Sequence, residues 1–273
     1  MEQDLKGHRA VITGASSGLG EEYSRQLAAR GVDLVIAARR VDRLQKLAAE
    51  LIAKYAVKIE VLQLDLVGPG AAVQLFQAAT AQSRKVTMLI NNAGIGPFAR
   101  FLDEKPEKHL NTMQLNTVAL TELCHHFATH MVGHGSRSYI TNVGSIASFQ
   151  GVPNFAVYSA TKFYVRVLSE ILARELKRTK VSVTCLCPGG THTEFSDANG
   201  QVLKEAATSM MMSASVVVAL GIRGMLAGRT IVVPGFLNKL ACFFPRLVPN
   251  GLALTLAQVA MDRSATPVQR QLK

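Results

Sequence analysis

The sequence predicts one α/β domain built around a doubly wound, mainly parallel sheet. Seven short apolar runs, bounded by glycine or charged residues, have the length and composition of buried strands. Segments with helical periodicity lie between them, and this alternation is typical of βαβ units. A glycine-rich stretch, TGASSGLG at residues 13–20, directly follows the first run, as expected for a tight turn between a strand and a helix.

The elements follow one another up to about residue 235. The expected strands are residues 8–13, 32–38, 57–65, 86–90, 138–143, 181–187 and 229–233. The expected helices include residues 21–30, 43–54, 71–83 and 155–178. No linker, repeat or low-complexity tract interrupts this series. A chain of 273 residues can bury the core of one large α/β domain, so we assign residues 1–273 to a single domain.

Composition narrows the class of protein. No apolar run approaches the roughly 18 residues of a membrane span, and the N-terminal residues are unlike a secretory signal. The 4 cysteines are too few for a disulfide framework, so a reducing cytoplasm is the expected compartment. The formal charge is +11, but the basic residues are scattered without interleaved aromatic residues. A solvated basic surface is therefore favoured over a nucleic-acid interface.

Three histidines recur at helical spacing. His126, His130 and His134 could hold a metal ion on one helix face. Apart from Cys124 or Glu122, no carboxylate or cysteine completes a ligand set at matching spacing. We therefore expect a polar helix end near a subunit contact, and no metal site.

The glycine-rich turn predicts a dinucleotide site. Gly14, Gly18 and Gly20 permit a sharp bend and let backbone N–H groups approach a ligand closely. The helix that follows presents free N–H groups and a positive dipole end, which favour a pyrophosphate. The same turn contributes Ser16, Ser17 and Leu19 to the expected cofactor site.

The end of the second strand predicts which dinucleotide binds. An acidic residue there would hold a ribose 2′-hydroxyl, whereas an arginine accepts a 2′-phosphate. The sequence has Arg39 and Arg40 and no acidic residue at this point. Guanidinium groups suit phosphate, so we infer NADP(H), with Arg39 as the preferred contact and Arg40 beside it. A solvated helix start is the alternative.

The pentapeptide YSATK, residues 158–162, has the spacing of an acid–base pair. Tyr158 and Lys162 are four residues apart, so they would stand on the same helix face. An ammonium group beside a phenol makes the phenolate easier to form. A chance pairing of two common residues is the alternative.

Seven motifs occur in the order and spacing of one known family. They are TGASSGLG (13–20), Asp65 after the third strand, NNAG (91–94), Asn116, Ser145, YSATK (158–162) and PGGTHT (188–193). Over about residues 5–235 the chain resembles the classical short-chain dehydrogenase/reductases. The resemblance implies a Rossmann-type sheet of seven mainly parallel strands in the order 3-2-1-4-5-6-7, with helices on both faces.

The resemblance also implies reversible hydride transfer between a nicotinamide and a carbonyl or alcohol carbon. Tyr158 would be the general acid or base, with Lys162 tuning its proton and holding the nicotinamide ribose. Ser145 would orient the substrate oxygen, and Asn116 would help to hold a water molecule beside Lys162. A serine in an ordinary turn and a surface asparagine are the alternatives at these last two positions.

Further cofactor contacts are carried over in the same way. Asp65 and Leu66 would lie at the adenine, and the backbone near Gly94 would approach the ribose. The other residues assigned to the cofactor site are Asn92, Ala93, Pro188, Gly189, Thr191 and Thr193. A helix N-cap for Asp65, a stitch between strand ends for Asn92 and a plain loop turn for Pro188–Gly189 are the alternatives.

The resemblance places a substrate lid at residues 194–228. Its three methionines, residues 210–212, favour a bulky apolar substrate, although core packing explains them equally well. Residues 236–273 form an apolar extension, with a polar, mobile tail expected after about residue 261. The segment 236–260 would cover the pocket, join a subunit interface or contact a membrane surface peripherally.

Together these features predict an NADP(H)-dependent oxidoreductase acting on a small apolar carbonyl or alcohol. A 3-oxoacyl thioester reductase, served by an acidic acyl carrier protein, is the alternative within the enzymes. A non-catalytic NADP(H)-binding redox sensor is the alternative from another class. We expect a homodimer or homotetramer.

Overall fold

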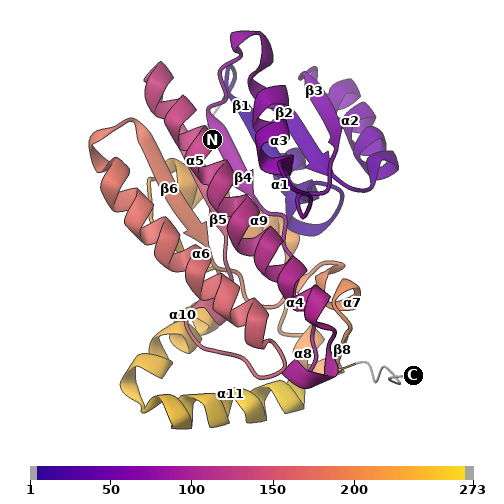
Figure 1. Cartoon of the computed structure of the whole chain (residues 1–273), viewed down its shortest axis with the longest axis vertical. Helices are drawn as coiled ribbons and strands as arrows, with labels where there is room; N and C mark the ends of the chain where they lie inside the picture. The colour runs from indigo at the N-terminus through magenta and orange to yellow at the C-terminus, as the bar shows by residue number, and fades with distance from the viewer. Residues whose placement is uncertain (1–4, 268–273) are drawn as a thin grey trace.

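A seven-stranded parallel sheet lies at the centre of the computed structural model, which describes residues 5–267 (Figure 1). Its strands are β1 (Arg9–Thr13), β2 (Asp33–Ala38), β3 (Ile59–Gln63), β4 (Met88–Asn91), β5 (Ser138–Val143), β6 (Val181–Leu186) and β10 (Ile231–Val232). They run in the order β3-β2-β1-β4-β5-β6-β10, and every neighbouring pair is parallel. The predicted fold and strand order are confirmed, with β10 as the seventh strand.

Helices cover both faces of the sheet because each central strand is apolar on both sides. Along β1, Ile12 packs into one buried cluster and Val11 into the other, as the alternation of a strand requires. The first cluster lies under α1 (Gly18–Ala28), α2 (Val41–Tyr55) and α9 (Ala214–Leu226). The second lies under α3 (Ala71–Thr80), α5 (Leu120–His134) and α6 (Ala156–Glu175).

Shorter elements connect these layers. Helix α4 (Pro106–Met113) continues through a π-helical stretch, η3 (Gln114–Ala119), into α5. Single turns are η1 (Ala81–Ser83), η2 (Phe101–Asp103), η4 (Ile146–Ser148), η5 (Leu176–Arg178) and η6 (Phe244–Leu247). Two-residue strands β7 (Thr191–His192) and β9 (Met212–Ser213) pair with each other.

The predicted lid region contains α7 (Phe195–Ala198), β8 (Gln201–Leu203) and α8 (Glu205–Thr208), and it ends in α9. Helix α9 belongs to the core layer, since Val217, Val218, Ile222 and Met225 are buried against the sheet. The chain then forms α10 (Phe236–Phe243) and α11 (Asn250–Ser264), which lie at the end of the molecule far from β3 (Figure 1).

The polar tail expected after about residue 261 is partly wrong. Helix α11 continues to Ser264, and strand β11 (Ala265–Pro267) then pairs antiparallel with β8. Ala265 is buried in this pairing, so residues 265–267 pack against strand β8 of the lid. Residues 268–273 of the expected tail lie outside the described residues.

The extension is unusually apolar at its surface. Exposed side chains include Phe236, Leu237, Leu240, Phe243 and Leu247. Between residues 5 and 267 the helices are all too short or too polar to cross a bilayer. Peripheral membrane contact through residues 236–260 stays a prediction.

Candidate active site

The predicted acid–base pair lies near the start of α6, at the carboxyl end of β5. Lys162 is only 5 % exposed, and its Nζ lies 5.6 Å from the ring centroid of Tyr158. The ammonium group donates a 2.8 Å hydrogen bond to the carbonyl oxygen of Val143, the last residue of β5. The spacing in YSATK thus brings both groups to one helix face, as predicted.

Burial controls the ionisation of both groups. It raises the pKa of Tyr158 to about 12, although a hydrogen bond with Ser145 works in the opposite direction. It also lowers the pKa of Lys162 to about 8. The neutral phenol is therefore the favoured form in this structure, because desolvation disfavours the phenolate. The lowering of the tyrosine pKa by Lys162 stays a prediction. Near neutral pH the phenol carries its proton and is ready to donate it.

Ser145 is held firmly by a turn of its own. Its Oγ accepts a 3.1 Å hydrogen bond from the backbone N–H of Ala147, and its own N–H donates to Ser148 Oγ at 3.2 Å. These two bonds form a capping box around η4. Ser145 thus lies in a turn, as the alternative to a catalytic role proposed. The same turn positions the Ser145 hydroxyl, which also forms a hydrogen bond with Tyr158.

Asn116 is buried in the π-helical stretch η3, not exposed at the surface. Its Oδ1 accepts from the N–H of Ile95 at 3.0 Å, and its Nδ2 donates to the carbonyl of Ile95 at 2.8 Å. The amide also donates to Thr161 Oγ1 at 3.0 Å, beside Lys162. Asn116 therefore ties the loop after β4 to the helix that carries the acid–base pair.

The glycine turn has the shape of a phosphate cradle. Gly14 and Gly18 have φ angles of 66° and 58°, in the left-handed region that favours glycine. A Cβ on Gly20 would lie 2.4 Å from the carbonyl oxygen of Gly14, so no side chain fits there. The N-terminus of α1 opens at this point. The residues present therefore fit a dinucleotide pyrophosphate.

The ends of neighbouring strands are joined by Asn92. Its Nδ2 donates to the carbonyls of Thr13 and Gly14 at 3.0 and 3.2 Å, so it stitches strand ends as the alternative proposed. The N–H of Ala93 donates to Thr13 Oγ1 at 3.0 Å. A Cβ on Gly94 would lie 3.5 Å from Lys162 Nζ, which brings this loop close to the pair.

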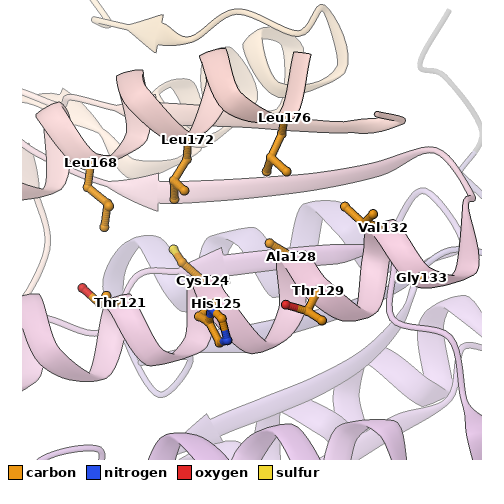
Figure 2. Close-up of a pocket in the computed structure, with 10 residues that line it drawn as sticks. All are labelled: Thr121, Cys124, His125, Ala128, Thr129, Val132, Gly133, Leu168, Leu172 and Leu176. Carbon is orange, nitrogen blue, oxygen red and sulfur yellow. The ribbon is translucent and has the colours of Figure 1, made fainter. Parts of the chain in front are cut away.

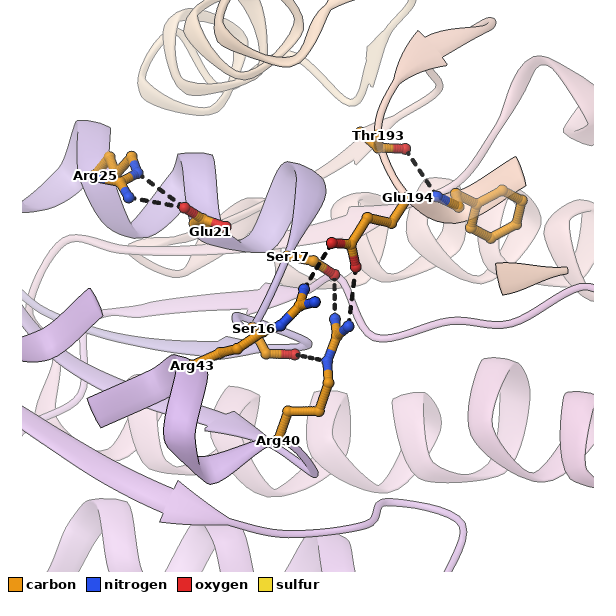
Figure 3. A network of polar contacts seen from close by, with 9 residues as sticks. Ser16, Ser17, Glu21, Arg25, Arg40, Arg43, Thr193 and Glu194 are labelled. Carbon is orange, nitrogen blue, oxygen red and sulfur yellow. Dashed lines mark hydrogen bonds and ion pairs between the residues drawn. The ribbon is translucent and has the colours of Figure 1, made fainter. Parts of the chain in front are cut away.

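The two arginines after β2 point in different directions. Arg39 has a 70 % exposed side chain and lies 4.0 Å from Asp65 Oδ2. Arg40 instead lies on the glycine turn, where its Nε donates to Ser16 Oγ at 3.2 Å and its Nη2 to Ser17 Oγ at 2.7 Å (Figure 3). The structure thus places Arg40, rather than the preferred Arg39, beside the expected phosphate site.

Two charged residues missed by sequence reasoning complete this cluster. Arg43 Nη1 lies 2.6 Å from Glu194 Oε1, and Arg40 Nη1 lies 2.9 Å from Glu194 Oε2 (Figure 3). Arg43 could have been found as a cation one helical turn beyond Arg39. Glu194 comes from the far end of the chain, and no local pattern signals it.

The remaining cofactor assignments lie around the same edge of the sheet. Asp65 Oδ1 accepts from the N–H of Val67 at 3.1 Å within a turn, and Leu66 is buried. The alternative of a helix N-cap at Asp65 is wrong, because α3 begins at Ala71 with Gly70 as its N-cap. The carbonyl of Pro188 accepts from Ile146, and Gly189 packs against Asn238. Thr191 Oγ1 donates to the carbonyl of Gly189, and Thr193 lies beside Gly18. The segment 188–193 therefore runs from the tyrosine end of the site to the glycine turn.

Aromatic and aliphatic side chains enclose the tyrosine. The ring of Tyr158 lies 5.0 Å from Phe155 and 5.6 Å from Phe195, measured between centroids. Phe98 packs on Phe155 at 4.8 Å. Other apolar residues of this cluster are Val152, Leu203, Met261 and Ala265. Phe98 and Met261 had no signal in the sequence, since Phe98 lies in the loop after β4 and Met261 comes from α11, about 100 residues beyond Tyr158.

The histidines of α5 bond to backbone rather than to one another. His130 Nε2 accepts from the N–H of Val86 at 3.2 Å, and His134 Nε2 lies 3.1 Å from the carbonyl of the same residue. His126 stacks on Phe76 at 5.2 Å. Among the residues that the structure describes, no group of three or more histidine, cysteine or acidic side chains could hold a metal ion.

A separate cavity of about 500 Å³ lies between α5 and α6 (Figure 2). Its walls include Cys124, His125, Leu168, Leu172 and Leu176. Leu168 is ten residues beyond Tyr158 on α6, which is about 15 Å along the helix. The cavity is thus distinct from the predicted site.

A phosphate cradle beside a half-buried tyrosine and a buried lysine defines a dinucleotide-binding oxidoreductase. The sequence model of the short chain dehydrogenase family matches residues 8–203, and the chain belongs to this family. An uncharacterized oxidoreductase of Mycobacterium tuberculosis is 34 % identical over 222 residues, which cover 80 % of this chain and 83 % of the relative.

Two further proteins bear on the activity. A short-chain dehydrogenase from Sphingobium yanoikuyae, solved in complex with NADPH, superposes with a TM-score of 0.79 at 30 % identity, covering 97 % of this chain and 98 % of the other. The very-long-chain 3-oxoacyl-CoA reductase of Meyerozyma guilliermondii is 34 % identical over 187 residues, 65 % of this chain and 54 % of the relative.

Proposed function

We propose that the protein is an NADP(H)-dependent oxidoreductase that interconverts a carbonyl and an alcohol on a lipophilic substrate. The observation that carries this proposal is the apolar cluster around the Tyr158 ring, where Phe155 and Phe195 contact the ring and Phe98 packs on Phe155. An apolar lining favours a substrate whose carbonyl is flanked by hydrocarbon.

The residues present divide the chemistry between them. The nicotinamide supplies or accepts the hydride when bound. In reduction, negative charge develops on the substrate oxygen, and the Tyr158 hydroxyl donates its proton there. Ser145, fixed by its capping box, donates a hydrogen bond to the same oxygen. Lys162 stabilises the phenolate that remains, and Asn116 holds the loop and helix that frame the pair.

The proposed preference for NADP(H) rests on Arg40, which donates to Ser16 and Ser17, and on Arg43, which shares the Glu194 carboxylate with it. Replacing Arg40 with alanine is expected to weaken NADP⁺ binding about 10- to 100-fold, since charge-assisted hydrogen bonds to a phosphate are lost. NAD⁺ binding should change little. Calorimetric titration with both cofactors measures this difference, and Arg39→Ala is the matched control. Equal losses for NAD⁺ and NADP⁺ would refute the preference.

A panel of carbonyls and alcohols, followed by absorbance with NADPH and NADH in parallel, tests the reaction itself. Turnover of apolar ketones with NADPH is expected. Failure of every carbonyl and alcohol would leave the non-catalytic sensor as the better account.

A 3-oxoacyl thioester reductase is a second candidate. It is favoured by the similarity to the fungal very-long-chain 3-oxoacyl-CoA reductase and by the net charge of +11, which suits an acidic carrier protein. Turnover of an acetoacetyl thioester, together with capture by acyl carrier protein, would support it. Faster turnover of simple apolar ketones and no capture would favour the leading proposal.

Gly96 is expected to be essential for the position of Tyr158. A Cβ at this residue would lie 2.3 Å from Tyr158 Cδ2, which is far inside van der Waals contact. Gly96→Ala should therefore lower the free energy of unfolding by about 1–3 kcal/mol and reduce kcat. Urea denaturation and initial rates measure both effects.

The matched control is Gly251→Ala in α11, where an added Cβ meets no atom within 4 Å. It should be neutral or stabilising by up to about 1 kcal/mol. Unchanged stability and rate in Gly96→Ala would mean that Tyr158 has room to move, contrary to the packing described.

We also propose that the homodimer or homotetramer forms through α5 and α6. Val132, Val167 and Ile171 are exposed along these helices, beside the apolar cavity between them. Ile171→Glu, at a position 53 % exposed, should shift the mass in light scattering toward the monomer without unfolding the chain. Leu102→Glu, at an 89 % exposed position elsewhere, should leave the mass unchanged. An oligomer that survives Ile171→Glu uses another surface.

A further inference from the structure

Glu194 and Phe195 contact opposite ends of the site although they are neighbours in sequence. The Glu194 carboxylate accepts from Arg40 at 2.9 Å and from Arg43 at 2.6 Å (Figure 3). The Phe195 ring packs on Tyr158 at 5.6 Å. The lid thus begins with one residue on the predicted phosphate site and the next on the predicted proton donor.

The carboxylate uses the donors that a phosphate would need. Arg40 directs two of its nitrogens to Ser16 and Ser17, and it directs its remaining one, Nη1, to Glu194. Arg43 directs Nη1 to the other carboxylate oxygen. A phosphate monoester carries a charge of about −1.5 to −2 and three acceptor oxygens, so it attracts this pair more strongly than one carboxylate.

We propose that Glu194 is an internal anion occupying the cofactor's 2′-phosphate site, and that a 2′-phosphate displaces it and thereby draws Phe195 away from Tyr158. This inference rests on the proposed NADP(H) dependence. Thr193, the residue before Glu194, lies beside Gly18 of the phosphate cradle, and the N–H of Phe195 donates to Thr193 Oγ1 at 3.3 Å. A ligand in the cradle therefore meets Thr193 and Glu194, which directly precede Phe195.

Two consequences follow for recognition. Glu194 competes with the 2′-phosphate for Arg40 and Arg43 through two exposed ion pairs. It therefore lowers the affinity for NADP(H) and has only a weak effect on the affinity for NAD(H). Phe195 covers Tyr158 until the phosphate arrives, so the dinucleotide binds before the carbonyl substrate. Glu194 is therefore a specificity-determining residue that acts through Arg40 and Arg43.

The chain offers a clean reporter, because it contains no tryptophan. Phe195→Trp places a single indole at the lid, and acrylamide quenching reports its exposure. Adenosine 2′,5′-bisphosphate is the probe, with 5′-AMP for comparison, since neither carries a nicotinamide that could contact residue 195 directly. At saturation the bisphosphate should raise the quenching constant at least about twofold, whereas 5′-AMP should leave it unchanged.

Glu194→Gln in the otherwise unchanged chain gives a second measurement that needs no tryptophan. Its affinity for the bisphosphate, by calorimetry, should be about fivefold higher than that of the unchanged chain, as expected when two exposed competing ion pairs are removed. Affinity for 5′-AMP should stay the same. Glu50→Gln is the control, because Glu50 also pairs with an arginine, Arg25, but contacts neither Arg40 nor Arg43.

The outcomes separate this inference from the function on which it rests. Weaker bisphosphate binding by Glu194→Gln would overturn it, since Glu194 would then hold the ligand rather than compete with it. Tight bisphosphate binding with unchanged quenching would also overturn it and leave the NADP(H) proposal intact. Bisphosphate binding no tighter than 5′-AMP would overturn both.

Discussion

Tyr158→Phe is expected to lower kcat for carbonyl reduction by about 100- to 10,000-fold, the usual contribution of a positioned proton donor. The phenylalanine keeps the ring between Phe155 and Phe195, so folding and NADPH affinity should change little. Stopped-flow or steady-state rates with the best ketone of the panel, together with a cofactor titration, measure the two effects separately.

Tyr164→Phe is the matched control. Tyr164 lies on the same helix, and its hydroxyl contacts Thr121 at 2.7 Å on an exposed face. Removing that hydroxyl should leave kcat within about twofold. A fully active Tyr158→Phe would exclude Tyr158 as the proton donor, and unchanged cellular effects despite lost turnover would favour the redox sensor.

Lys162→Met is expected to make the protein more stable at pH 7 and much less active. A lowering of the lysine pKa from 10.5 to about 8 corresponds to about 3 kcal/mol of unfavourable free energy for the buried ammonium. The variant loses the hydrogen bond to Val143, which offsets about 1 kcal/mol. The net gain in unfolding free energy should be about 2 kcal/mol, and the fall in kcat about 100-fold.

The difference in unfolding free energy between Lys162→Met and the wild type should change with pH in a definite direction. Below pH 8 both states of the wild type bind the lysine proton, so the cost of burying the charge is fully present. Between pH 8 and 10.5 the unfolded state binds more protons than the folded state, so wild-type stability rises with pH relative to the variant. The advantage of Lys162→Met should therefore shrink across this window.

Urea denaturation at pH 7 and about pH 9.5 measures the difference. The exposed Lys46→Met is the control, and it should show neither the stabilisation nor its loss at high pH. A Lys162→Met protein that is less stable than wild type at pH 7 would mean that the ammonium is well solvated or paired in the folded state.

Much of the fold could be read from local patterns. Strand β1 was expected because its central residues, 10–12, are apolar and bounded by charge and glycine, and all five residues of the strand are buried. The glycine turn was expected because only glycine adopts its φ angles without strain, and the structure has Gly14 and Gly18 there. The facing of Tyr158 and Lys162 needed nothing beyond helical geometry.

Other features depended on where distant segments meet. The orientation of Arg40 toward the glycine turn, and of Arg39 toward Asp65, follows from packing after β2 and not from residue type. Glu194 pairs with arginines 154 and 151 residues earlier in the chain. The antiparallel pairing of β11 with β8 likewise joins segments about 60 residues apart, and no periodic pattern in the sequence predicts this pairing.

The amino-acid order by itself determined which segments form strands and helices, where the cofactor turn lies and which helix face carries the tyrosine and lysine. These features follow from backbone geometry and from side-chain spacing within a few residues. Only the tertiary structure decided the enclosure of Tyr158, the direction of its pKa and the ion pairs on Arg40 and Arg43. Those features depend on burial and on long-range contacts, because desolvation and charge pairing arise only when remote segments come together.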